Sequence, residues 1–404
     1  MTTKEFIQRN IITLTFTVMV VLGLFMSKLM PFFIVNELVQ NFTQYAFLVL
    51  ALLIPIMAGM GFNFGIVIGA IAGNIGIIMA VNWGFSGFLG FLLAVVFATF
   101  FALLFGIPTG MLLNKARGHE MVTSLFVGYF GNGIYQFIFL LLIGAVIPMT
   151  PSLVLGSGVG LRNTIDLKDT LSHSVDGLLE VPFFFLLIVV GVFFLILNIY
   201  HLKKDDINSD KIKVISRLAI SAVVIIVSTM IMYVNVLPNE IKLLKGIQFP
   251  VVTGVLIGAA VAFNLLITRT KLGQEFMTVS SNQQDSKESN INSSKVRITA
   301  IVISTILASW GQIIFTQNTG VLMTYGSHYI GTISVLCLIV GGASLKRATV
   351  KQALIGVLLV QGFLLTSLPA IDEMFNGNVS EILRVIIMNG AFLYAFTMTR
   401  SKDY

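Results

Sequence analysis

Charged side chains are scarce in this chain. Asp, Glu, Lys and Arg together make up 11% of its 404 residues, whereas a soluble domain carries about 25%. Stretches of about twenty residues without a charge exclude a water-soluble globule and a disordered chain. The net charge of +7 is spread too thinly to indicate a nucleic-acid binder.

Cysteine and catalytic motifs are also nearly absent. Cys337 is the single cysteine, which excludes a disulfide scaffold, and no Cys/His cluster indicates a metal site. The chain has no HExxH pair, no GxSxG segment and no P-loop. We therefore expect no enzyme activity, no cofactor and no ATP hydrolysis by this chain itself, so that any ATP would be bound by partner subunits.

Apolar residues are abundant, at 56%, and the mean hydropathy is +0.94. The apolar runs are continuous rather than alternating, which predicts helices instead of a β-barrel. We expect an all-α fold, a polytopic transmembrane helical bundle of about 12 spans. The predicted spans are 11–30, 44–61, 63–82, 87–107, 121–147, 182–200, 217–236, 249–268, 297–316, 328–345, 351–369 and 380–399.

The distribution of Lys and Arg predicts which side each loop faces. With both termini in the cytoplasm, only six of the 25 basic residues lie outside, as the positive-inside rule requires. These six are Lys28, Arg162, Lys168, Lys242, Lys245 and Arg384. Residues 148–180 then form an extracellular loop, and residues 268–297 form the longest cytoplasmic loop, which is either a solvated linker or a short interfacial helix that presents Phe276 and Met277 to a partner.

Ionisable groups are missing from the predicted membrane interior. No acidic residue falls in the middle of a predicted span, and the four histidines lie in loops or at span ends. Proton-coupled transporters place such groups within the bilayer. Coupling to a proton gradient is therefore disfavoured, while sodium binding by carbonyl and hydroxyl oxygens stays open.

The polar groups inside the spans are uncharged amides. Asn63 and Asn74 lie in a stretch where glycine recurs every four residues, which lets a helix face approach its neighbour closely. These amides either bond neighbouring helices or line a path, where they would offer donors and acceptors to a hydroxyl-rich solute. The predicted path residues are Asn63, Phe64, Asn74 and Tyr325.

Three segments, in this order, resemble the membrane-spanning permease of ATP-binding-cassette importers for ribose-type sugars, nucleosides and branched-chain amino acids. The first is GIPTGMLLNKARGHEMVTSL (106–125), and the last is LIVGGASLKRATVKQALIG (338–356). The strongest lies between them, in the loop that begins TRTKLGQEFMTVSSN at Thr268. Its matching residues are Arg269, Thr270, Gly273, Asn282, Asn290, Ile291, Asn292 and Lys295.

The resemblance implies a single permease domain over residues 1–404, with a core of about ten spans and residues 182–236 as an inserted helix pair. It also implies cytoplasmic ATP-binding-cassette subunits, a second permease chain (identical or paralogous), an extracellular solute-binding protein and a place in the lipid of a bacterial inner membrane. Residues 268–297 would be the loop that couples the chain to its ATPase. The coupling residues are Arg269, Thr270, Gly273, Glu275, Phe276, Met277, Asn282 and Asn292.

The sequence thus predicts the permease subunit of an importer for a small polar solute, most simply a sugar or a nucleoside. An ion-gradient-driven secondary transporter is the alternative, and a non-transporting assembly factor or flippase-like protein is a third hypothesis. Neighbouring genes for a tandem P-loop ATPase and a secreted binding protein would favour the first.

Overall fold

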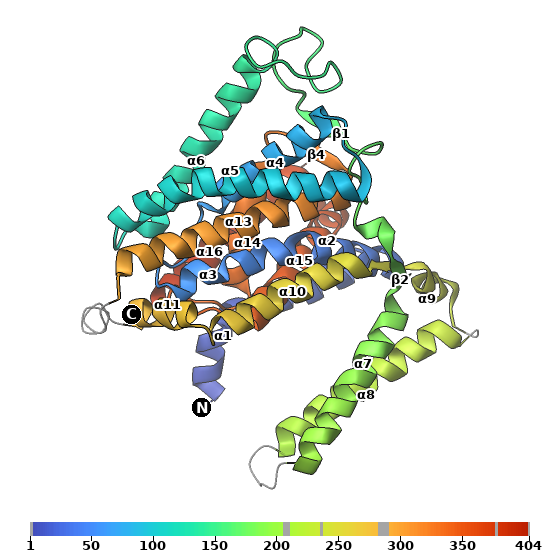
Figure 1. The fold of residues 1–404 in the computed structure, drawn as a ribbon. Helices are drawn as coiled ribbons and strands as arrows, with labels where there is room; N and C mark the ends of the chain where they lie inside the picture. Colours follow the sequence, from blue (N-terminus) through green and yellow to red (C-terminus); the bar gives the residue numbers. More distant parts are fainter. Residues whose placement is uncertain (1–2, 205–210, 235–236, 282–290, 376–378, 403–404) are drawn as a thin grey trace.

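A computed structural model describes residues 3–204, 211–234, 237–281, 291–375 and 379–402 (Figure 1). Helices make up most of these residues. The long helices are α1 (Thr3–Met26), α2 (Pro31–Ala51), α4 (Ile66–Asn82), α5 (Gly87–Lys115), α6 (Glu120–Phe137), α7 (Phe183–Lys204), α8 (Lys211–Tyr233), α10 (Val251–Ile267), α11 (Lys271–Ser281), α13 (Ser293–Thr319), α14 (Ser327–Val340), α15 (Val350–Phe375) and α16 (Ser380–Lys402). The short elements are α3 (Leu53–Met57), α9 (Asn239–Lys242), the turns η1 (Ile138–Leu142), η2 (Asp176–Leu178) and η3 (Leu243–Gly246), and the strands β1 (Thr164–Asp166), β2 (Glu180–Pro182), β3 (Gln248–Pro250) and β4 (Val321–Met323).

Within the described ranges, seven helices are long and apolar enough to cross a membrane. An eighth span results if α10 and α11, which meet at a bend of 69°, are counted together. The remaining apolar helices are shorter. The described part of the chain is therefore mostly helical, with several helices that are long and apolar enough to span a membrane. The count of about twelve spans and the side of the membrane on which the termini lie stay predictions. One boundary differs clearly. The helix that contains the start of the second predicted span, 44–61, begins earlier than predicted, at Pro31, a residue that suits the first turn of a helix.

Glycine brings α4 into close contact with its neighbours, as its four-residue spacing predicts. A Cβ on Gly69 would lie 2.6 Å from the Cβ of Ala308 in α13, and a Cβ on Gly73 would lie 2.6 Å from the carbonyl oxygen of Ser309. One turn further, a Cβ on Gly76 would lie 2.8 Å from the Cβ of Ala98 in α5. Helix α4 is consequently buried along almost its whole length, between α5 and α13.

Helices α7 and α8 form a hairpin that extends away from the remaining helices (Figure 1). Its two ends are held together because β2 and β3 pair antiparallel, with the N–H of Phe183 donating to the carbonyl of Ile247 at 2.9 Å. The chain thus leaves and re-enters the bundle at one point. The hairpin lies within residues 182–236, whose identity as an inserted helix pair stays a prediction. The many exposed apolar side chains of the hairpin suit contact with lipid.

Residues 148–180, which we call the cap, fold back onto the bundle. Strand β1 of the cap pairs antiparallel with β4, directly after α13. Leu161, Leu167 and Leu171 of the cap are buried. The predicted loop is therefore a packed element that closes one end of the bundle, although the side of the membrane on which it lies stays a prediction.

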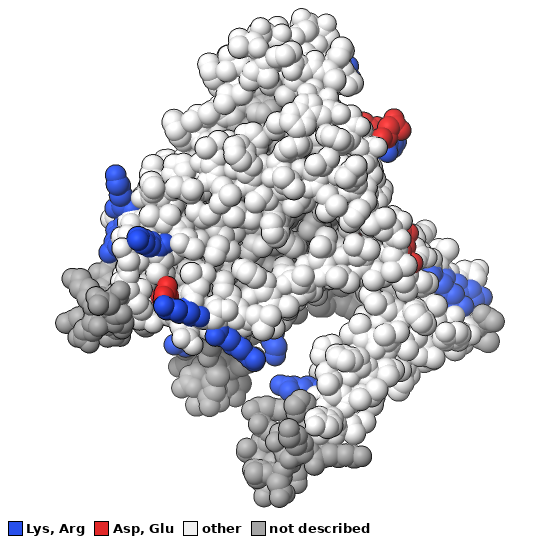
Figure 2. Space-filling model, viewed as in Figure 1, with Lys and Arg blue, Asp and Glu red and all other residues white. Residues whose placement is uncertain are grey.

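Charged side chains lie mainly at the two ends of the bundle on the face that Figure 2 shows. Lys and Arg gather where α5 ends and α13 begins, which we call the basic end, and near α11. At the opposite end, acidic side chains appear near β1 and β2, and further Lys and Arg side chains appear near α9. A broad uncharged surface separates the two ends, as a membrane-embedded protein requires.

Candidate functional site

A break between two buried helices forms the centre of the candidate site. Helix α3 ends at Met57 and α4 begins at Ile66, and the residues between them are not helical, although most are buried. Gly59 and Gly61 adopt the left-handed conformation, with φ of +72° and +66°, which glycine enters without steric cost. Irregular backbone at membrane depth is tolerated where it is buried in protein or lines a cavity, and transporters use such broken helices to build binding sites.

Two cavities that share part of their lining lie along this break. The inner cavity has a volume of about 500 Å³ and is lined by Phe64 together with residues of α6, α14 and α16. The second, of about 360 Å³, is lined by Gly59–Phe62, by the turn before α6 and by Lys346. Met121, Val122 and Phe396 line both. Together the cavities follow the break as far as the turn before α6, at the basic end. Val122, Tyr129 and Tyr329 are about half exposed, so the inner cavity is open on one side.

Asn63 and Phe64, two of the predicted path residues, lie in the break itself. Phe64 lines the inner cavity, and its backbone N–H donates to Ser124 Oγ of α6 at 3.0 Å. Asn63 Oδ1 accepts from the N–H of Gly65 at 2.9 Å, just before α4 begins. The Nδ2 of Asn63 is buried without a hydrogen-bond partner, which leaves one amide donor of the break unused.

Asn74 and Tyr325, the other two predicted path residues, lie elsewhere. Asn74 is fully buried: its Nδ2 donates to Ser327 Oγ, and its Oδ1 accepts from Gln312 Nε2, both at 2.9 Å. Asn74 therefore bonds α4 to α13 and α14. Of the two roles predicted for this amide, the structure shows the bond between neighbouring helices. The Tyr325 hydroxyl donates to the carbonyl of Leu161 in the cap at 3.3 Å, and desolvation raises its pKa, which keeps it protonated. Neither residue lines the two cavities.

The predicted coupling loop contains a sharp bend between α10 and α11. Thr270 Oγ1 accepts from the N–H of Gly273 at 3.2 Å and donates to the carbonyl of Ile267 at 2.7 Å, so this side chain bonds to both helices. A Cβ on Gly273 would collide with that same carbonyl. The Thr-x-x-Gly spacing is therefore explained by the bend.

Helix α11 has one face inside the protein and one outside. Phe276 is fully buried, so the prediction that it is presented to a partner is wrong; its aromatic ring instead belongs to the hydrophobic core that α11 shares with α3 and α13. Met277 is exposed, together with Gln274, while Glu275 is half-buried and Arg269 is exposed.

The two asparagines among the predicted coupling residues, Asn282 and Asn292, have different outcomes. Asn292 caps α13, because its Oδ1 accepts from the N–H of Lys295 at 3.1 Å. Capping of α13 therefore accounts for an asparagine at this position. Asn282 lies outside the described residues.

An ion pair at the basic end was missed by the sequence analysis. Arg297 of α13 donates from Nη2 to Glu120 at the start of α6, and both side chains are largely buried. Close by, Arg117 Nη2 donates to Ser294 Oγ at 3.2 Å. Each charge stands at the edge of an apolar run, where a solvent-exposed position is the usual expectation, so the pairing of two segments 177 residues apart left no local signal.

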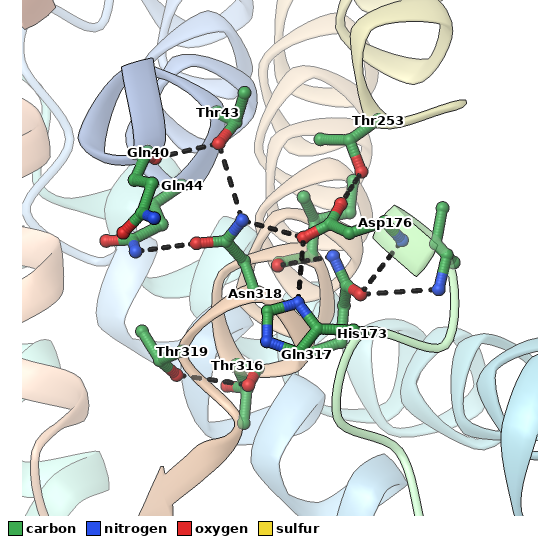
Figure 3. A network of polar contacts seen from close by, with 12 residues as sticks. Gln40, Thr43, Gln44, His173, Asp176, Thr253, Thr316, Gln317, Asn318 and Thr319 are labelled. Atoms are coloured by element: carbon green, nitrogen blue, oxygen red, sulfur yellow. Dashed lines mark hydrogen bonds and ion pairs between the residues drawn. The ribbon is translucent and has the colours of Figure 1, made fainter. Parts of the chain in front are cut away.

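A buried carboxylate was missed as well. Asp176 of the cap is 2% exposed, and it accepts hydrogen bonds from Thr253 of α10 and from Asn318 of α13, the latter at 2.7 Å (Figure 3). Asn318 Oδ1 in turn accepts from Gln44 of α2 at 2.6 Å. The sequence placed Asp176 in an extracellular loop, and only the folding of the cap onto three helices buries it.

The comparisons with known proteins leave the family open. No family model, no curated protein and no solved structure matches this chain. Within the described ranges, no group of three or more His, Cys, Asp or Glu side chains is arranged to hold a metal ion. Interpretation of the site therefore depends on its own geometry.

Proposed function

We propose that this chain is the permease subunit of an importer for a small polar solute, driven by separate ATPase subunits that contact α11. The observation that carries the proposal is the contact between α11 and the break in the α3–α4 region. A Cβ on Gly59 would lie 2.9 Å from the Cα of Ser280 in α11. A displacement of α11 would therefore be transmitted directly to residues 59–62, which line the second cavity.

The lining of the inner cavity favours a neutral solute. It contains the aromatic rings of Phe64, Tyr129 and Tyr329 and the hydroxyl of Thr332, and no charged residue is among its lining residues. Aromatic faces with a few hydroxyl groups suit a sugar or a nucleoside. A second permease chain, an extracellular solute-binding protein and a bacterial inner membrane complete the proposal.

An ion-gradient-driven secondary transporter remains the second candidate. The observation that favours it is Asp176, a carboxylate that the fold buries and that could bind a coupling ion. Asp176 lies in the cap rather than among the residues that line either cavity. Ion binding at Asp176 would therefore act on the solute path less directly than a displacement of α11 would.

Replacing Met277 tests the docking of the ATPase on α11 without changing the stability of the fold. We expect Met277→Ser to lower ATP-driven uptake about tenfold, the effect of one well-placed interface side chain. The thermal midpoint should stay unchanged, because Met277 is exposed. Phe276→Ala, one position earlier, should instead cost about 3–5 kcal/mol of unfolding free energy, because it empties a buried aromatic site. The measurement is uptake of labelled ribose and uridine by ATP-loaded membrane vesicles of the source cell, with thermal unfolding of each purified variant.

Met323→Ser is the matched control. Met323 is an exposed methionine of β4, next to the cap and away from α11. This control should leave uptake unchanged. Full uptake by the Met277→Ser variant would contradict α11 as the docking surface for the ATPase.

A further inference from the structure

Different faces of α6 line the inner cavity and a separate apolar groove. Leu125 and Tyr129, about one turn apart, line the inner cavity. Phe130 and Ile134, also about one turn apart, line the groove. The groove has a volume of about 360 Å³, lies between α4, α5 and α6, and has no charged residue in its lining. It is therefore distinct from the cavity that we assign to the solute.

The groove is open along one side. Helices α5 and α6 are joined by the short turn 116–119 and diverge from it (Figure 1). Phe130 and Ile134 of α6 are 72% and 46% exposed, and Pro108 of α5 is exposed as well. Both helices are long and apolar enough to cross a membrane, so this opening faces the hydrocarbon of the bilayer.

The dimensions of the groove match one extended hydrocarbon chain. Its lining on α6 and η1 extends over residues 127–139, a length of about 18 Å at 1.5 Å per residue. An acyl chain of one leaflet spans about 15 Å, half of the hydrocarbon core. Dividing the groove volume of about 360 Å³ by the length of the lining gives a mean cross-section of about 20 Å². A helix about 10 Å wide needs roughly 80 Å², so the groove is too narrow for a helix of a partner protein.

A lysine continues the groove at the end near the turn between α5 and α6. Phe105, Pro108 and Leu112 line the groove from α5, at helical positions i, i+3 and i+7. Lys115 follows at i+10, so it stands on the same face of α5, and it is exposed. No Asp, Glu, Lys or Arg occurs in residues 87–114. Lys115 is therefore placed where the apolar span ends and the lipid headgroups begin.

The charge at this end of the groove is positive. Arg117, two residues after Lys115, is exposed in the turn. Glu120, the next acidic residue along the chain, is paired with Arg297, so it does not neutralise Lys115. Basic residues next to a membrane surface attract anionic headgroups. The groove thus combines an apolar channel with a positive charge at the headgroup level.

We propose that the groove binds an anionic phospholipid, with one acyl chain between α5 and α6 and the headgroup beside Lys115. The apolar lining accepts the chain, and the ammonium group of Lys115 favours a headgroup with a net negative charge over a zwitterionic one. The lipid lies on a different side of α6 from the inner cavity. The proposal therefore does not depend on which solute or energy source the protein uses.

Fluorescence quenching of the full-length chain in lipid vesicles tests the proposal. Cys337 is fully buried, so Phe130→Cys provides an accessible thiol for a fluorescent label at the rim of the groove. The vesicles contain equal parts of phosphatidylglycerol and phosphatidylcholine, and the acyl chains of one lipid or the other carry bromine as the quencher. We expect phosphatidylglycerol to associate with the groove about fivefold more strongly, the effect of about 1 kcal/mol for one lysine near the headgroups. In Phe130→Cys/Lys115→Gln this preference should disappear.

Two controls separate binding in the groove from a general attraction of anionic lipid. Lys351→Gln removes an exposed lysine of α15, which does not line the groove, and should retain the preference of the Phe130→Cys label. A label on Leu103→Cys, at an exposed position of α5 outside the groove, should show no preference. Equal quenching by the two lipids at Phe130→Cys, a preference that survives Lys115→Gln, or the same preference at Leu103→Cys would overturn the proposal.

Discussion

Replacing Arg297 with methionine is expected to cost about 3–5 kcal/mol of unfolding free energy, because Glu120 would be left as a buried charge without its partner. The side chain of Arg297 is 8% exposed and that of Glu120 is 13% exposed. Water therefore screens this pair far less than an ion pair at the surface. The pair also joins the start of α6 to the start of α13, so its loss would loosen the basic end.

A double variant identifies the cause of that loss. In Glu120→Gln/Arg297→Met both charges are removed, and most of the lost stability should return, since replacing a buried pair by neutral groups is often nearly neutral. Thermal and denaturant unfolding of the purified variants measures both effects. If Arg297→Met alone cost less than about 1 kcal/mol, the usual upper range for exposed pairs, the pair would not be buried as described.

Filling the inner cavity is expected to abolish transport without unfolding the protein. Leu125 of α6 lines the inner cavity, and a tryptophan at this position would occupy part of its roughly 500 Å³ volume. We expect Leu125→Trp to lower solute uptake by at least about tenfold, because a displaced solute loses more than about 1.4 kcal/mol of binding free energy. The measurement is uptake of labelled ribose and uridine by membrane vesicles.

Val127 provides a matched control on the same helix. It faces an apolar groove of about 360 Å³ between α4, α5 and α6 rather than the inner cavity. Val127→Trp adds the same indole ring to this groove and should leave uptake nearly unchanged. Equal loss of uptake in both variants would show that α6 tolerates no enlargement, and it would remove the reason for assigning the inner cavity to the solute.

Local patterns in the sequence predicted the helices and their closest contacts. The apolar runs indicated helices because lipid leaves the backbone few alternatives, and the glycine spacing indicated the face of α4 that packs against α13. The break before α4 lies where the predicted spans 44–61 and 63–82 leave almost no room for a loop. These features depend on neighbouring residues, which is why a single sequence reveals them.

The long-range polar contacts could not be predicted in the same way. Asp176 resembles any other loop carboxylate until the cap folds onto α10 and α13, and Phe276 resembles an exposed interface residue until α11 packs against α3 and α13. Of the four predicted path residues, Asn63 and Phe64 lie at the break, close to Gly59 and Gly61, whose left-handed backbone belongs to it. Asn74 has the same amide, but its partners come from α13 and α14.

Transport by the isolated chain tests most directly whether separate ATPase subunits drive it. The purified protein is reconstituted alone into lipid vesicles, and an inward proton gradient or sodium gradient is imposed in the presence of labelled ribose or uridine. We predict that neither solute accumulates above its external concentration, because the link from α11 to the cavity has nothing to displace it. Accumulation driven by either gradient would contradict the proposal and would favour a secondary transporter.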